Sequence, residues 1–151
     1  MSAVCHECGA ALDANGSCRE LFHELLALEA GVPGGPGALP HFFAVATYNL
    51  QHPSGFAPAA LRGLRRTVTD VLEGRATLDD ARRRAKAGAG GSHRVRRHLD
   101  DEILPEDAAM LDAWPRRWPM TVRDVCRSAP ERYADRVREW AEVTVDALAR
   151  H

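Results

Sequence analysis

Residues 5–30 read CHECGAALDANGSCRELFHELLALEA and hold three of the four cysteines of this 151-residue chain. The first two are spaced as C-x-x-C, which lets two thiolates bind one metal ion from a tight turn. Cys18 follows Ser17, which forms the capping motif S-x-x-E with Glu20, so a helix should begin at Cys18. The N–H groups and the dipole of a first helical turn favour the thiolate form of cysteine. The stretch therefore predicts a metal-binding turn of the zinc-knuckle type, followed at once by a helix.

Composition predicts one soluble domain. The chain is 45% hydrophobic with a formal net charge of -1, so it can bury a core and lacks the overall charge of a protein that coats nucleic acid or membrane. No apolar run is long enough to span a membrane, and the first ten residues do not resemble a signal peptide. We expect a cytoplasmic protein, in which clustered cysteines are more often ligands than disulfides. The abundance of arginine and alanine is typical of a GC-rich bacterium.

Helical spacing of apolar residues recurs along the chain, and no strand pattern of any length alternates with it. We expect a mainly α domain with at most a short β ribbon beside the cysteines. Helices are predicted at 18–30, 41–52, about 58–73, about 77–87, 105–114, 121–126 and from 130 onward. The single domain 1–151 then comprises a metal knuckle (1–17), a helical core (18–75), a basic, Gly-containing segment (76–100) that includes a GAGGS loop, and C-terminal helices (101–151).

A closed zinc site takes four ligands, so the three cysteines need a partner. The helices 18–30 and 41–52 are joined by a short loop and should be antiparallel neighbours, which places the end of the second beside the start of the first. His52 then lies near Cys18, whereas His41 lies roughly 16 Å from His52 at about 1.5 Å per residue. We predict a structural Cys₃His zinc site with the ligands Cys5, Cys8, Cys18 and His52.

Alternatives for this site stay open. His6 or Cys126 are the rival fourth ligands, and Gln51 or Tyr48 are the candidate outer partners of the ligands. In the alternative without a metal ion, Cys18 is a buried apolar thiol and His52 only binds carbonyl groups at the end of its helix. Cys126 by itself is expected to be a core thiol, and the two tryptophans around Pro115 are expected to pack in the core and a turn.

Three catalytic signatures are incomplete. HELLA, at residues 23–27, lacks the second histidine of the zinc-protease helix H-E-x-x-H. The C-x-x-C is not preceded by the proline or the H-x-E of zinc deaminases. A loop follows it, whereas a thioredoxin-like redox pair opens a helix.

Glu29 and His41 are the candidate catalytic pair, because the predicted helix pairing brings them together at the end opposite the cysteines. A carboxylate that orients an imidazole suits proton transfer, so the first alternative function is a small-molecule enzyme. The structural alternative is a hydrogen bond that closes the loop between the two helices. A concave pocket reaching the pair favours the enzyme, and a pair sealed by side chains opposes it.

Residues 61–100 carry 11 basic and 5 acidic side chains, so the second alternative is an adaptor or nucleic-acid-binding module. Arginines on helices usually pair with nearby acids, and GAGGS lacks the G-K-[ST] ending of a phosphate-binding loop. We therefore expect no nucleic-acid partner and no membrane partner. The basic candidates are Arg62, Arg65, Arg66, Arg82, Arg83, Arg84, Lys86, Arg94, Arg96 and Arg97.

Five motifs occur in order over nearly the whole chain: CHECGA, the cysteine before LFHELLALE, YNLQHPS, PMTVRDV and VREWAEVTVDAL. Together they resemble an uncharacterised bacterial family, domain of unknown function 5946. The resemblance implies a compact bacterial domain with a metal knuckle, and it implies no reaction. The basic stretch 82–98 has no counterpart in this resemblance. By position, the resemblance supports Cys5, Cys8, Cys18 and His52 and draws attention to Glu29 and His41.

Overall fold

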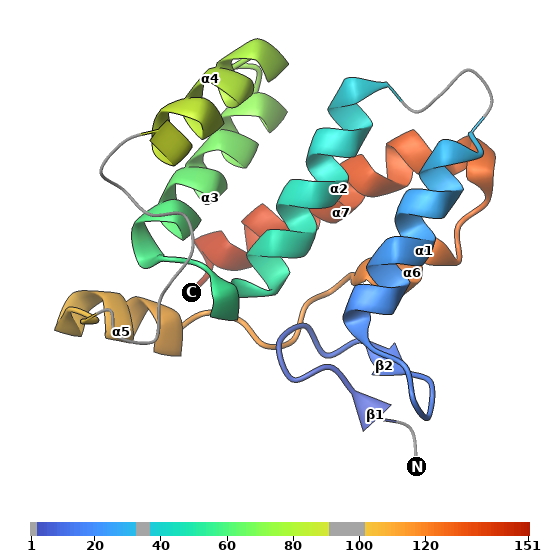
Figure 1. Cartoon of the computed structure of the whole chain (residues 1–151), viewed down its shortest axis with the longest axis horizontal. Helices are drawn as coiled ribbons and strands as arrows, with labels where there is room; N and C mark the ends of the chain where they lie inside the picture. Colours follow the sequence, from blue (N-terminus) through green and yellow to red (C-terminus); the bar gives the residue numbers. More distant parts are fainter. Residues whose placement is uncertain (1–2, 33–36, 91–101) are drawn as a thin grey trace.

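A computed structural model of the chain describes residues 3–32, 37–90 and 102–151 (Figure 1). Seven α-helices and a two-stranded antiparallel ribbon account for most of these residues, which confirms the mainly α prediction. The helices are α1 (Cys18–Ala30), α2 (Ala38–Gln51), α3 (Pro58–Leu72), α4 (Leu78–Gly90), α5 (Pro105–Asp112), α6 (Val122–Cys126) and α7 (Tyr133–Ala149). The strands are β1 (Ala3–Val4) and β2 (Ala11–Leu12), and 3₁₀ turns lie at η1 (Pro53–Gly55) and η2 (Pro130–Arg132).

The capping motifs set where two helices begin. The Ser17 hydroxyl accepts a hydrogen bond from the Glu20 N–H at 3.2 Å, and the Glu20 carboxylate accepts one from the Ser17 N–H at 2.9 Å. This reciprocal pair fixes Cys18 as the first residue of α1, as the sequence predicts. Thr121 and Asp124 form the same arrangement at the start of α6.

The helix α4 is longer than predicted. It continues through Gly90 instead of ending near Ala87, since a glycine costs only about 1 kcal/mol relative to alanine in a helix interior and here alternates with alanine. The prediction of a loop over 88–90 is therefore wrong. The rest of that loop, 91–92, and the basic candidates Arg94, Arg96 and Arg97 lie outside the described residues.

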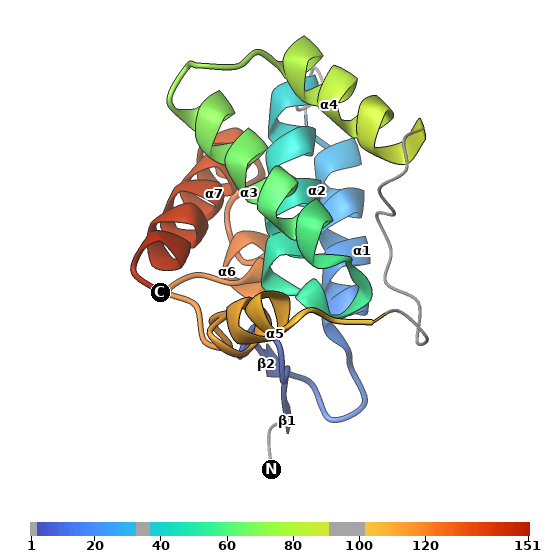
Figure 2. The same cartoon turned by 90° about the vertical axis from the view of Figure 1, so that its left-hand side faces the viewer.

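The helices α2 and α7 form the centre of the fold, with α1 and α6 on one side and α3 and α4 on the other (Figures 1 and 2). The Arg138 guanidinium lies 5.8 Å from the centroid of the Phe43 ring, and the Gln51 amide bonds Thr144. Because residue numbers rise together along both helices, α2 and α7 run in the same direction. No helix in the described ranges has the length and apolar character needed to cross a membrane.

Gln51 faces this central interface, so its predicted place beside the metal ligands is wrong. Its buried amide donates hydrogen bonds to the Met120 carbonyl and the Thr144 hydroxyl, both at 2.9 Å. The helix α2 ends at Gln51, and His52 has the non-helical backbone angles φ -129° and ψ 68°. The two neighbouring side chains therefore face different elements: His52 faces the cysteines, and Gln51 faces α7.

The two tryptophans around Pro115 are buried, as predicted for core and turn packing. The Trp114 indole N–H donates to the Leu50 carbonyl at 2.8 Å, near the end of α2. The Trp118 indole N–H donates to the Glu7 carbonyl at 3.4 Å. The segment between α5 and α6 thus holds the cysteine turn against the end of α2.

Candidate metal centre

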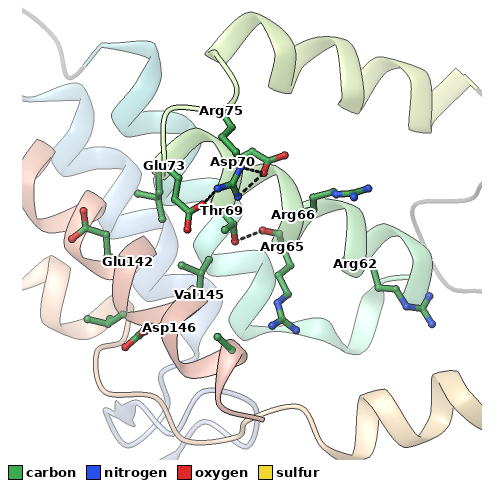
Figure 3. Close-up of a pocket in the computed structure, with 13 residues that line it drawn as sticks. Arg62, Arg65, Arg66, Thr69, Asp70, Glu73, Arg75, Glu142, Val145 and Asp146 are labelled. Atoms are coloured by element: carbon green, nitrogen blue, oxygen red, sulfur yellow. Dashed lines mark hydrogen bonds and ion pairs between the residues drawn. The ribbon is translucent and has the colours of Figure 1, made fainter.

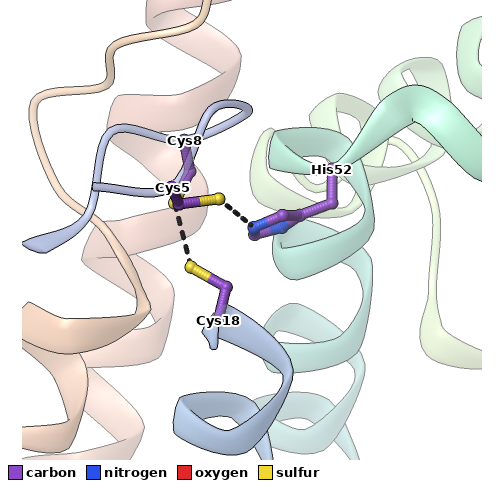
Figure 4. A group of neighbouring side chains, drawn as sticks. All are labelled: Cys5, Cys8, Cys18 and His52. Carbon is purple, nitrogen blue, oxygen red and sulfur yellow. Dashed lines mark hydrogen bonds between the residues drawn. The ribbon is translucent and has the colours of Figure 1, made fainter. Parts of the chain in front are cut away.

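Three cysteines and one histidine converge where the ribbon meets α1 and α2 (Figure 4). Cys5 and Cys8 come from the turn between β1 and β2, Cys18 opens α1, and His52 directly follows α2. Their three sulfur atoms and one imidazole nitrogen all lie within 4.8 Å of one another. The structure thus brings together the four side chains that the sequence predicts as ligands.

Backbone hydrogen bonds hold the C-x-x-C turn in shape. The Cys5 N–H donates to the Ala10 carbonyl at 2.9 Å, and the Gly9 N–H donates to the Cys5 carbonyl at 2.8 Å. Gly9 has a φ of 78°, a left-handed conformation that glycine adopts without the steric cost of a side chain. The Ala10 N–H also donates to the Cys8 sulfur at 3.4 Å, as is common beside thiolate ligands.

The imidazole of His52 is oriented by Tyr48. A carbonyl oxygen can only accept, so the 2.7 Å contact between His52 Nδ1 and the Tyr48 carbonyl places a proton on Nδ1. The other ring nitrogen, Nε2, then faces the cysteines and lies 3.6 Å from the Cys5 sulfur. The two rings also stack, with centroids 4.1 Å apart. Of the two outer partners considered, Tyr48 is the one that contacts His52, in the arrangement usual for a metal-binding imidazole.

The spacing of the donor atoms fits tetrahedral zinc. Bond lengths of about 2.3 Å to sulfur and 2.0–2.1 Å to nitrogen give ligand–ligand distances of about 3.8 Å between two sulfurs and 3.6 Å between sulfur and nitrogen. The Cys5 sulfur lies 3.6 Å from His52 Nε2, and the Cys8 and Cys18 sulfurs are 3.4 Å apart. All four cysteines of the chain are free thiols. Small side-chain movements are enough to accommodate an ion.

Hydrogen bonds within the cluster shift the pKa values in opposite directions. The hydrogen bond with Cys18 lowers the pKa of Cys8, and the same bond, together with burial, raises the pKa of Cys18. Burial lowers the pKa of His52, but hydrogen bonds to Cys8 and to the Tyr48 carbonyl outweigh it and raise that pKa to about 9. Buried sulfurs this close cannot all ionise unless a positive charge lies among them.

Neither rival fourth ligand belongs to this cluster. His6 lies in the same turn but is exposed. The Cys126 thiol donates to the Leu21 carbonyl at 3.2 Å, and burial raises its pKa to about 11. Cys126 is therefore a neutral, half-buried thiol between α6 and α1, close to the core role that the sequence predicts.

Glu29 and His41 meet at the other end of the α1–α2 pair, as predicted. His41 Nδ1 donates to one Glu29 oxygen at 2.7 Å, and the Tyr133 hydroxyl donates to the other at 3.1 Å. Glu29 is buried, whereas the His41 side chain is 54% exposed. Burial, and next the charge of Glu29, raises the pKa of Tyr133, so the phenol remains a neutral donor. Sequence reasoning missed Tyr133, whose only signal is its place on the apolar stripe of the last helix.

This network joins α1, α2 and α7, which is what a structural role requires. We expect His41→Phe and Tyr133→Phe each to lower the free energy of unfolding by about 1–3 kcal/mol, because each leaves a buried Glu29 oxygen without its donor. Urea denaturation measures this loss, and metal analysis of the same variants should show no change. Unchanged stability in His41→Phe, combined with loss of a cellular phenotype, would instead support a catalytic pair.

Comparison with protein families gives a match to the Family of unknown function (DUF5946) over residues 3–149. The chain belongs to this family. The DUF5946 match includes the ribbon, the Cys₃His cluster and the C-terminal helix, and it confirms the resemblance seen in the sequence. No match was found among curated proteins or among solved structures. Membership of DUF5946 assigns no reaction, so the function has to be argued from the site.

Proposed function

We propose that this protein binds one structural zinc ion through Cys5, Cys8, Cys18 and His52. The observation that supports it most strongly is the convergence of three thiols and one imidazole within 4.8 Å. Zinc prefers this donor set, and four protein ligands leave no open position at which a water molecule is activated. When bound, the ion would supply fixed links between ligands and no Lewis-acid catalysis.

The placement of the ligands supports a structural role. They come from the ribbon turn, from the start of α1 and from the end of α2. Each strand has only two residues, and a ribbon of two such strands is not stable on its own. One ion bound by these four residues would link the ribbon to α1 and α2. It would thereby fix the N-terminal segment on the helical core.

Glu7, inside the C-x-x-C, strengthens the same link. Its carboxylate accepts a hydrogen bond from the Ser54 N–H at 2.9 Å, two residues beyond His52. Its carbonyl accepts the bond from Trp118. These contacts hold the turn against the end of α2 and so support a preformed ligand geometry.

The two alternative functions have less support. Both Glu29 oxygens have protein donors, which fits a structural network. Among the described residues of 61–100, several arginines pair with acids, as expected for solvated helix faces. These pairs are Arg62–Asp107, Arg82–Asp79, Arg83–Asp80 and Arg84–Asp70. Four free cysteines fit a reducing compartment, and we infer a bacterial, cytoplasmic protein.

Metal analysis of the purified protein tests the proposal. We expect about one zinc ion per chain in untagged protein prepared under reducing conditions without chelator. His52→Ala should lose most of this metal, because it removes the imidazole ligand. His41→Ala is the matched control, since His41 is the histidine at the opposite end of α2, and this variant should keep the metal. A metal-free wild-type protein would overturn the proposal, whereas iron with the same His52 dependence would correct only the metal.

A further inference from the structure

A cavity of about 960 Å³ lies between α2, α3 and α4, away from the cysteine cluster and from Glu29. Its walls are mainly apolar, formed by Phe42 of α2, Phe56 before α3, Leu64 of α3 and several alanines. Pockets of roughly 300–1,000 Å³ with apolar walls and a few polar groups are typical binding sites for small molecules.

A second cavity, of about 880 Å³ between α3 and α7, has a different character (Figure 3). Arginines and carboxylates line it together with apolar residues of both helices, and some of the charged side chains pair within the lining. Arg75, for example, bonds Asp70 at 3.0 Å and also pairs with Glu73. The lining of this cavity is less apolar than that of the cavity between α2, α3 and α4, so the latter is the better candidate for an apolar ligand.

The polar groups of the apolar cavity leave one positive charge without a partner. Arg84 donates to Asp70 at 2.9 Å and to the Thr67 hydroxyl at 3.3 Å. Asp70 also binds Arg75, so its charge is fully compensated. Arg66 is exposed at the cavity edge and has no ion pair or side-chain hydrogen bond among the described residues. Two arginines and one aspartate give the lining a net charge of +1.

Gly63 is an exposed residue of α3 that lines the cavity. It lies in the interior of α3, where glycine costs about 1 kcal/mol relative to alanine. A Cβ atom at this position would meet no atom within 4 Å. The missing side chain therefore does not relieve a backbone clash, and its effect is to leave space within the cavity.

We propose that this cavity binds a small amphipathic organic anion. Its apolar body would lie against Phe42, Phe56 and Leu64, and its acidic group would pair with Arg66. Charge complementarity favours an anion, and the mainly apolar walls exclude a small, fully hydrated ion such as free phosphate. The inference does not depend on the zinc proposal, because no metal ligand lines the cavity.

Fluorescence titration of the full-length, metal-replete protein with 8-anilinonaphthalene-1-sulfonate tests this proposal. This probe combines an aromatic body with one sulfonate. We expect saturable binding at about one site per chain. Gly63→Leu, which adds a bulky side chain to the lining, and Arg66→Gln, which removes the cation, should each weaken binding about tenfold or more. Arg65→Gln is the matched control, because Arg65 is on the same helix but lines only the other cavity.

Circular dichroism of each variant shows whether it folds, and Gly63→Leu should fold because leucine favours helix. A neutral analogue, N-phenyl-1-naphthylamine, should bind more weakly than the sulfonate. The proposal is overturned by absence of saturable binding, by equal binding to wild type and both cavity variants, or by equal binding of the neutral probe. The proposal would also be overturned if the wild-type protein formed a dimer in which a second copy of the chain covers the cavity.

Discussion

From the proposed zinc site we expect that removal of the ion unfolds the N-terminal ribbon and the start of α1 before the helical core. Cys8 is fully buried, and Cys8→Ala deletes one ligand and leaves the Ala10 N–H without its sulfur acceptor. A ligand present at a thousand times its Kd stabilises the folded state by about 4 kcal/mol. For a chain of this size, losing about 4 kcal/mol of stability lowers Tm by roughly 8–16 °C.

Thermal denaturation with and without a strong chelator measures the fall in Tm, and hydrogen exchange locates it. Amides of the ribbon and of the first turn of α1 should lose protection in the chelated protein, while those of α2 and α7 should keep theirs, because these two helices contribute much of the core. Cys126→Ser is the matched control, since the fourth cysteine lies outside the cluster. Equal Tm and equal exchange after chelation would show that the ion does not hold the ribbon.

The candidate site could be predicted because short-range rules place all four of its members. The capping box fixes Cys18 as the first residue of α1, and the C-x-x-C spacing fixes two more thiols. The short loop between α1 and α2 then brings His52 to Cys18 and His41 to Glu29. Each step involves neighbours in the sequence or helices joined by one loop.

The features that the sequence did not reveal depend on distant segments. Gln51 bonds Met120 and Thr144, which are 69 and 93 residues away. Tyr133 reaches Glu29 across 104 residues. No loop length or cap indicates that α7 runs alongside α2 in the same direction, so the direction of the Gln51 side chain could not be derived. The cavity between α2, α3 and α4 was not predicted for the same reason, because it forms only when these three helices pack together.

Trp140→Ala is expected to lower the free energy of unfolding by about 3–5 kcal/mol, since it deletes the largest fully buried side chain from the core around α2 and α7. A loss of this size corresponds to a fall in Tm of roughly 6–20 °C for a chain of this length. Urea denaturation at constant metal content measures the change. Metal should remain bound in the folded variant, because Trp140 contributes no ligand.

Trp140→Phe separates packing from hydrogen bonding at this position. The Trp140 indole N–H has no hydrogen-bond partner among the described residues. Phenylalanine keeps most of the aromatic volume and removes a buried donor that is not satisfied, so the expected loss is below about 1.5 kcal/mol. If Trp140→Phe lost as much as Trp140→Ala, the indole N–H would have to donate to a buried water molecule.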